Sequence, residues 1–411
     1  MHRKLPTLLA LAVTAIALGA EHAGHGAAHG HSTPATSGTD LRADAAFDAE
    51  GRLWMVRHRG GFIEALSSED LGRRWSEPVR VNRDPEDIDP GGDARPKVLP
   101  GKNGALFISW TRPLAKPYTG EIRFSRSTDG GRSFEPPRTV HRDRAEITHR
   151  FDALALDAEG RLFVAWIDKR DAMAAAAAGR PYRGAALYFA VSADGGATFA
   201  GDFKAADHTC ECCRIALAPA ADGGVHALWR HIFEPDVRDH ALARLGADGT
   251  AGPLRRATFD DWRVNACPHH GPSLAPDDKG ALHAVWFTAT AAGGRAAYGR
   301  LAGDAPPGAI RTLGGRLAAH ADLRVSRPRI IAAWKEFSDG MNQLRVAESR
   351  DAGATWRESV LAGTPGACSQ PRVLELDGEF LVFWNTQAGP LLHRLPATDS
   401  SKAENHSTLP P

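Results

Sequence analysis

Two short segments of this 411-residue chain concentrate side chains that bind metals. The first reads Cys-Glu-Cys-Cys at residues 210–213, and the second reads Cys-Pro-His-His at residues 267–270. Thiolate and imidazole are ligands that copper and zinc favour in proteins. Because Cys210, Cys212 and Cys213 are so close in sequence, several of their sulfurs can face one ion. The two segments therefore indicate a copper or zinc site.

The same cysteines also permit disulfide bonds. Their number is five, so at least one thiol stays free or pairs with another chain. Adjacent Cys212 and Cys213 can bridge only through a strained ring. Cys210 or Cys212 can pair with Cys267 if their α-carbons come within about 6 Å of each other. Metal binding, thiol-redox chemistry and structural disulfides therefore stay open as interpretations of the cysteines.

The elements that must position these residues are short β-strands that repeat along the chain. Seven apolar runs each contain one tryptophan, and they span residues 53–56, 106–110, 162–166, 225–229, 282–286, 330–334 and 380–384. A shorter strand precedes each run, beginning near Arg42, Arg95, Arg150, Arg214, Pro272, Asp322 and Arg372. Turns rich in Asp and Gly between the two strands predict hairpins. The recurrence predicts a repeat architecture in which the tryptophans fill the core between units.

Four copies of the pattern Ser-x-Asp-x-Gly-x-x-Trp/Phe connect later strands of the repeat. They begin at Ser68, Ser127, Ser192 and Ser349 and end at Trp75, Phe134, Phe199 and Trp356. In such a turn the Ser and Asp side chains bond nearby backbone amides, and glycine takes a positive φ. This motif is the Asp box, and over residues 41–396 the chain resembles the sialidase-like (BNR-repeat) β-propellers.

The resemblance implies an all-β fold, a six- or seven-bladed β-propeller of four-stranded blades. Counting the repeats predicts seven blades, whereas sialidases have six. The first six units each have room for four strands. The seventh unit ends after a third strand near residues 391–395, and we expect residues near the N-terminus to supply its missing outer strand.

In a propeller, the loops that lead into the inner strands gather at one mouth of the central channel. All five cysteines precede an inner strand in this way, as do His149, His208, His269, His270 and His320. We therefore predict one metal site at that mouth. Its ligands would be Cys210, Cys212, Cys213, Cys267, His269 and His270, with Cys368 and His149 as outer members.

The resemblance also implies an alternative site made of arginines. Sialidases hold the carboxylate of sialic acid with three inner arginines, an arrangement of bidentate, charge-assisted hydrogen bonds. On this interpretation the chain is a glycoside hydrolase. Its clamp would come from Arg95, Arg150, Arg214 and Arg372, with Asp93 and Asp152 as candidate acid/base residues. An arginine at each blade start can equally serve to bond neighbouring loops.

The chain departs from the sialidase pattern at two places. The segment that matches the family's Arg-Ile-Pro motif reads Leu-Arg-Ala-Asp at residues 41–44. No tyrosine follows Tyr298, so the late-blade tyrosine nucleophile is missing. The resemblance thus supports a propeller architecture more than it supports glycoside hydrolysis. A third hypothesis is a propeller that binds a protein or a small glycan and catalyses no reaction.

The N-terminus has the pattern of a secretory signal peptide over residues 1–20, with basic residues at 2–4 and an apolar run at 5–18. Residues 21–40 are rich in Gly, Ala and His and are expected to form a flexible tether. Residues 397–411 are expected to be a disordered tail. We therefore expect a periplasmic or secreted protein without an integral membrane segment after signal cleavage.

Composition excludes several other classes of function. The formal net charge of +1 gives no reason to expect a nucleic-acid partner. No phosphate-binding glycine loop, His-Glu-x-x-His or Gly-x-Ser-x-Gly motif occurs, so we expect no nucleotide cofactor. The alanine-rich run at residues 174–178 is expected to be a flexible insertion.

Overall fold

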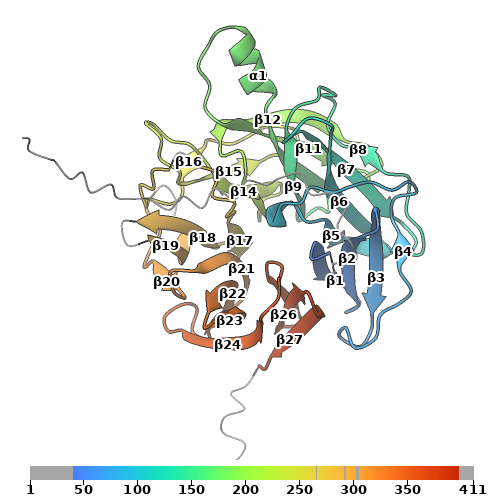
Figure 1. The fold of residues 1–411 in the computed structure, drawn as a ribbon, viewed down its shortest axis with the longest axis vertical. Helices are drawn as coiled ribbons and strands as arrows, with labels where there is room; N and C mark the ends of the chain where they lie inside the picture. The colour runs from blue at the N-terminus through green and yellow to red at the C-terminus, as the bar shows by residue number, and fades with distance from the viewer. Residues whose placement is uncertain (1–39, 265, 291–292, 302–304, 398–411) are drawn as a thin grey trace, which may run out of the picture. The chain divides into compact units, whose positions relative to one another are not determined.

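The computed structural model describes residues 40–264, 266–290, 293–301 and 305–397. These residues form seven antiparallel sheets arranged as blades in a ring (Figure 1). The predicted signal peptide, almost all of the predicted tether and almost all of the predicted tail lie outside the described residues. Within the described ranges, no helix is long and apolar enough to cross a membrane.

The first three blades are each built from four consecutive strands, with the first strand innermost. Blade 1 consists of β1 (Ala43–Phe47), β2 (Leu53–Arg59), β3 (Phe62–Ser68) and β4 (Val79–Arg80). Blade 2 consists of β5 (Lys97–Pro100), β6 (Leu106–Pro113), β7 (Gly120–Ser127) and β8 (Arg138–Thr139). Blade 3 consists of β9 (His149–Leu156), β10 (Leu162–Asp168), β11 (Ala185–Ser192) and β12 (Ala200–Thr209).

The remaining four blades continue the ring in chain order. Blade 4 consists of β13 (Ala216–Pro219), β14 (Val225–Arg230), β15 (His240–Leu245) and β16 (Arg255–Arg256). Blade 5 consists of β17 (Ser273–Pro276), β18 (Leu282–Thr290), β19 (Gly293–Leu301) and β20 (Arg311–Leu313). Blade 6 consists of β21 (Ala318–Ser326), β22 (Arg329–Ser338), β23 (Met341–Ser349) and β24 (Arg357–Thr364). Blade 7 consists of β25 (Arg372–Leu376), β26 (Glu379–Thr386) and β27 (Gly389–Leu395).

The count of seven blades is confirmed, and the sialidase count of six does not apply to this chain. Blade 7 has three strands in the described part of the chain, as expected, and the N-terminal segment proposed as its fourth strand falls outside that part. Blade 7 closes against blade 1 through side chains, because Leu374 and Phe383 share a buried cluster with Ala43 and Leu53. The side-chain amide of Asn385 also donates to the Leu41 carbonyl at 3.2 Å.

The recurrent tryptophans are core residues, as the repeat predicted. Six of them, at 110, 166, 229, 286, 334 and 384, are among the largest fully buried side chains, and Trp54 is 4% exposed. Trp54 shares a buried cluster with Val98 and Leu106 of the next blade. Burial of such large rings between adjacent sheets supplies much of the apolar area that holds the ring together.

The Asp boxes lie on the outer hairpins and fix the contact between neighbouring blades. In the second box the Ser127 hydroxyl donates to Asp129 at 2.7 Å and accepts from the Gly131 amide at 2.9 Å. Gly131 has φ 76°, and a Cβ there would lie 2.4 Å from the ring of Trp54 in the preceding blade. Glycine is therefore required both by the backbone and by the packing. The motif therefore serves the architecture.

One element differs from the sequence-based expectation. The alanine-rich run forms part of a helix, α1 (Arg170–Ala177), which follows β10 and stands at the rim of the ring (Figure 1). Alanine has the highest intrinsic helix propensity, which explains why this segment becomes helical instead of forming an irregular insertion.

Candidate functional site

Three thiols converge where the chain passes from blade 3 to blade 4. The Sγ atoms of Cys210 and Cys212 lie 3.6 Å apart, and those of Cys212 and Cys213 lie 3.9 Å apart. All three sulfurs lie within 4.8 Å of one another, and all three residues are buried. The Cys210 amide donates to the Arg230 carbonyl at 2.9 Å, which anchors the turn to β14. We call Cys210, Cys212 and Cys213 the thiol cluster.

Cys267 reaches the thiol cluster from the segment that leads into blade 5. The Cys212 thiol lowers the pKa of Cys267, although the two residues are far apart in sequence. Cys267 is exposed, in contrast to the three thiols it approaches. All five cysteines of the chain are free thiols, so none of the disulfides considered from the sequence is present.

Two arginines place positive charge beside the thiol cluster. The Nη1 atom of Arg238 lies 3.9 Å from the Cys210 sulfur. Arg230 is 1% exposed and donates to the carbonyls of Arg238 and Phe287, both at 2.7 Å. Hydrogen bonds from the other two cluster thiols, together with the charge of Arg230, lower the pKa of Cys210 well below its usual range although burial opposes this. Neither arginine can be predicted from the sequence, because neither belongs to a pattern with the cysteines.

The predicted histidine ligands have other contacts. The ring of His270 stacks on Phe287 at 4.0 Å and lies 4.4 Å from the ring of His320, measured between centroids. His269 is exposed. Among the described residues, the compact group that could hold a metal contains the three cluster thiols and no imidazole. The two histidines thus lie on the same segment as Cys267 without joining that group.

The two predicted outer members lie in other blades. His149 stacks on His141 at 3.9 Å and its Nε2 atom lies 3.6 Å from a carboxylate oxygen of Asp168. Cys368 forms a β-bridge with Thr386 within blade 7. Cys368 precedes the inner strand of its blade, as the thiol cluster does, and His149 is the first residue of the inner strand of blade 3. The ring distributes these positions around the channel. A shared position in the repeat therefore does not bring the residues together.

Asp93 links four other blade entrances at the channel mouth. Its carboxylate accepts hydrogen bonds from the Gln370 side chain at 2.5 Å, from Arg214 at 2.9 Å and from the Gly271 amide at 3.0 Å. His320 lies 3.6 Å from the same carboxylate. Burial alone would raise the pKa of Asp93, but the charge of Arg214 and the bonds from His320 and Gln370 outweigh it and hold this pKa well below its usual value. The neighbours of Asp93 therefore stabilise its side chain as a carboxylate.

The inner arginines are also engaged with protein groups. Arg214 donates to the Ala321 carbonyl at 2.7 Å and to the Pro272 carbonyl at 3.1 Å, which joins blades 4, 5 and 6. Arg95 donates to the Gln370 carbonyl at 3.1 Å, and Arg150 pairs with Asp89. These contacts match the structural interpretation of the arginines, in which each bonds neighbouring loops.

The other candidate acid/base residue is likewise occupied. Asp152 is 1% exposed and accepts from Lys97 at 3.1 Å and from the Thr111 hydroxyl at 3.0 Å. Tyr298 lies on β19, where its hydroxyl is 2.7 Å from Nδ1 of His283. All four tyrosines of the sequence are described, and none lines the channel cavity.

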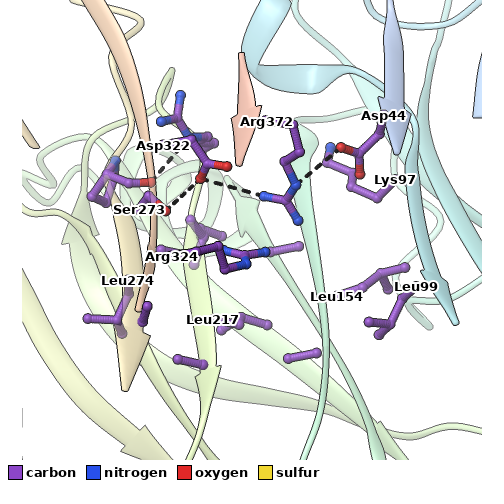
Figure 2. A pocket seen from close by; sticks show the side chains of 18 of the residues that line it. Asp44, Lys97, Leu99, Leu154, Leu217, Ser273, Leu274, Asp322, Arg324 and Arg372 are labelled. Atoms are coloured by element: carbon purple, nitrogen blue, oxygen red, sulfur yellow. Dashed lines mark hydrogen bonds and ion pairs between the residues drawn. The ribbon is translucent and has the colours of Figure 1, made fainter. Parts of the chain in front are cut away.

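The inner strands line a cavity of about 410 Å³ in the central channel. Figure 2 shows Arg372 between the carboxylates of Asp44 and Asp322, with Arg324 close by. The ion-pair distances of Arg372 are 3.4 Å to Asp44 and 3.7 Å to Asp322. Farther along the channel the wall becomes apolar, and it is formed by Leu99, Leu154, Leu217 and Leu274 (Figure 2). The cavity is charged at one end and apolar at the other.

Comparisons with known proteins locate the fold. No protein-family model and no curated protein matches the chain. Among solved structures it is similar to an ulvan lyase from a new family of polysaccharide lyases, with a TM-score of 0.52, 11% identity, and coverage of 86% of this chain and 91% of that one. It is also similar to an α-L-arabinofuranosidase from Fusarium graminearum, with a TM-score of 0.50, 13% identity, and coverage of 75% and 92%.

A weaker likeness extends to the NanB sialidase of Streptococcus pneumoniae, with a TM-score of 0.47, 11% identity, and coverage of 80% of this chain and 69% of that one. At such identities a structural likeness shows the fold alone. The ring of seven blades is a β-propeller fold, which the chain shares with the lyase and the arabinofuranosidase.

Two buried histidines that are not members of the thiol cluster make the stability of the propeller depend on pH. Burial, together with repulsion from His149, lowers the pKa of His141 to about 3, and burial lowers the pKa of His231 to about 4. Both rings stay neutral in the folded state but bind a proton in the unfolded state below about pH 6.5. Their contribution to stability is therefore complete above that pH and falls on acidification. We expect the free energy of unfolding to drop by about 2 kcal/mol per histidine between pH 7 and pH 5.

Urea denaturation at the two pH values measures this drop. In the variant His141→Gln, the drop in the free energy of unfolding between pH 7 and pH 5 should be smaller by the contribution of His141. The variant His269→Gln changes an exposed ring and should show the same drop as the wild type. An identical dependence in both variants and the wild type would contradict the assignment.

Proposed function

We propose that the chain binds one soft metal ion, copper(I), through Cys210, Cys212 and Cys213. The observation that supports this proposal is the group of three buried thiols whose sulfurs lie within 4.8 Å of one another. A metal with bonds to sulfur of about 2.3 Å holds its ligands about 3.7–4.0 Å apart, whether the arrangement is tetrahedral or trigonal. The spacings of 3.6 and 3.9 Å fit such an ion with little movement.

Copper(I) fits this donor set better than zinc. Structural zinc sites are closed by four ligands, whereas three thiolates complete a trigonal shell, and copper(I) is one of the ions that soft thiolates bind. The fourth thiol nearby, that of Cys267, is exposed and lies on another segment. We therefore assign the resident site to the three cluster thiols and treat Cys267 as a neighbour.

The surroundings offset the charge that such a complex would carry. Three thiolates with one copper(I) ion are net negative, and burying net charge is costly unless it is paired. Arg238 contacts the Cys210 sulfur, and the buried side chain of Arg230 lies beside the cluster. A guanidinium group carries a positive charge that can offset the negative charge of thiolates. The two arginines therefore stabilise the thiolate form that binds metal.

The N-terminal sequence leads us to propose that the chain is exported to the periplasm or beyond. Free thiols in an oxidising compartment form disulfides unless a ligand or burial protects them. A bound copper(I) ion would hold the three thiols in the reduced state.

Metal content and thiol count test the proposal. Mature protein purified without an affinity tag should contain or take up one equivalent of copper(I). Its denatured, metal-free form should titrate as five thiols. A protein that takes up neither copper nor zinc, or that titrates with fewer thiols before any reductant is added, would refute the proposed site.

The channel cavity favours a second candidate function, the binding of an acidic sugar. The cavity of about 410 Å³ is large enough for a sugar ring, and Arg95, Arg324 and Arg372 line its charged end. The solved structures that share the fold include a polysaccharide lyase and an arabinofuranosidase. Two of these arginines already have partners in the protein, which argues against hydrolysis. Arg372 pairs with Asp44 and Asp322, and Arg95 donates to a backbone carbonyl. A fluorogenic sialoside assay distinguishes the candidates, since turnover that is lost in Arg372→Ala but kept in Cys212→Ser would favour the sugar.

A further inference from the structure

We propose that the channel cavity binds a monocarboxylate with an apolar tail, whose carboxylate pairs with Arg324 and whose tail lies against the leucines of the channel wall. The described residues that line the cavity include no cysteine, so this site is independent of the proposed copper(I) site. It also differs from a site for an acidic sugar, because it assigns a chemical partner to the apolar end of the cavity as well as to the charged end.

The charged side chains of the cavity wall do not balance. Among the described lining residues, four are carboxylates, namely Asp44, Asp93, Asp152 and Asp322. Five are basic, namely Arg95, Lys97, Arg214, Arg324 and Arg372. The difference is one positive charge (five minus four). Because a net charge in a partly desolvated site is costly unless an opposite charge accompanies it, the count predicts a ligand with one negative charge.

Arg324 is the basic side chain that the carboxylates of the wall leave without an ion pair. It donates to the Leu323 carbonyl at 2.9 Å, and no carboxylate of the described residues forms an ion pair with it. Asp322, two positions before it on β21, already accepts from the Ser273 hydroxyl at 2.7 Å and from the Val373 amide at 2.8 Å. A guanidinium group has five N–H donors in a planar fork, so Arg324 keeps the capacity to bind a carboxylate through two of them.

The other carboxylates of the wall have partners of their own. Asp152 pairs with Lys97 at 3.1 Å, and Asp93 pairs with Arg214 at 2.9 Å. Asp44 lies 3.7 Å from Arg95. These pairs hold the acidic side chains of the wall away from Arg324, and the negative charge that Arg324 lacks must therefore come from a ligand.

A second guanidinium group increases the demand for an anion at this end. Arg372 lies close to Arg324 (Figure 2). Burial in the channel lowers the pKa of Arg324, and the positive charge of Arg372 adds to this effect. The Nε atom of Arg372 has no hydrogen-bond partner among the described residues, and its ion pairs with Asp44 and Asp322 are long. A bound carboxylate would offset the repulsion between the two arginines.

The opposite end of the cavity favours a hydrocarbon group. Leu99, Leu154 and Leu217 come from three different blades and are half-buried, and Leu274 lies beside them (Figure 2). A sugar placed here would press hydroxyl groups against hydrocarbon without partners, which is costly, whereas an apolar tail gains free energy by covering the leucines. The volume of about 410 Å³ lies within the usual range for small-molecule sites.

Calorimetric titration of the full chain with straight-chain carboxylates tests this site. We expect the affinity to rise about fourfold for each methylene group added from butanoate to octanoate, which corresponds to about 0.8 kcal/mol per buried CH₂. Glucuronate has the carboxylate without the apolar tail, and octanamide has the tail without the charge. Each of these should bind at least about tenfold more weakly than octanoate.

Two variants separate the roles of the two ends. Arg324→Met removes the charge and should weaken octanoate binding by at least about tenfold while the gain per methylene group stays the same. Leu217→Asn should weaken octanoate binding more than butanoate binding, because it places a polar group against the tail. Arg394→Met, which changes an exposed ion pair of blade 7, and Cys212→Ser should both bind octanoate as the wild type does. Urea denaturation shows whether each variant is folded.

Four results would overturn the proposal. They are an affinity that does not change with tail length, equal affinity for octanoate in Arg324→Met and the wild type, no binding of any of the carboxylates, and tighter binding of glucuronate than of octanoate. The last result would favour an acidic sugar as the ligand. Because the cavity site uses no cysteine, a failure to take up copper would refute the copper(I) site and leave the octanoate result unaffected.

Discussion

Replacing Cys212 by serine is expected to weaken copper(I) binding by roughly a thousandfold. Structural metal sites in proteins contribute about 10–16 kcal/mol of apparent binding free energy, so one of three equal ligands is worth about 4 kcal/mol. We expect the loss of affinity to be largest at Cys212 because its sulfur lies between those of the other two, at 3.6 Å from Cys210 and 3.9 Å from Cys213. Competition between the protein and a calibrated copper(I) chelator measures the affinity.

The matched control for this prediction is Cys368→Ser. Cys368 also precedes an inner strand, but it lies in blade 7 and bridges to Thr386. Its replacement should leave the affinity for copper(I) within about twofold of the wild-type value, because surface or peripheral changes away from a site rarely act on it. If Cys212→Ser retains the wild-type affinity, or if both variants lose it equally, the thiol cluster is not the binding site. Urea denaturation of each variant shows whether a loss of binding reflects a loss of folding.

Replacing Asp93 by alanine is expected to lower the free energy of unfolding by about 3–5 kcal/mol, the usual cost of removing one partner of a buried ion pair. The variant would leave Arg214, the Gln370 side chain and the Gly271 amide without the acceptor they share at the channel mouth. Asp93→Asn keeps the shape and one acceptor oxygen, so we expect an intermediate loss. Urea denaturation of both variants tests whether Asp93→Ala loses more stability than Asp93→Asn.

A surface ion pair provides the control. Asp278 is 66% exposed and lies 3.6 Å from Arg327, so Asp278→Ala should cost less than about 1 kcal/mol. The dependence on pH adds a second test. The pKa of Asp93 is held below its unfolded value near 4, so its stabilisation is complete above about pH 4 and is lost as the pH falls toward the folded pKa. The difference between wild type and Asp93→Asn should narrow below about pH 4, and a difference that stays constant down to pH 2 would contradict the ion-pair explanation.

Local patterns allowed much of the architecture to be predicted. The Asp boxes and the recurrent tryptophans are short signals, and each is decided by residues a few positions apart. The Ser127 box, for example, closes through bonds between residues two and four positions apart. The second strands that the pattern predicted all occur, and the blade count and the short seventh blade follow from them. The expectation of a flexible insertion at residues 174–178 is wrong because the high helix propensity of alanine makes the run part of helix α1.

That the cysteines precede inner strands and that three of them are close together follows from local spacing, so both properties can be predicted from the sequence. Which of the other candidates approach them depends on how the blades are arranged in the ring. Ring closure carries Asp93 to Gln370, 277 residues away, but leaves Cys368 and His149 in other blades than the thiol cluster. The physical reason is that equivalent positions in a closed ring point toward the axis from different directions. Contact therefore depends on which blades are neighbours and on how far each loop extends, and neither property is encoded in the spacing of one segment.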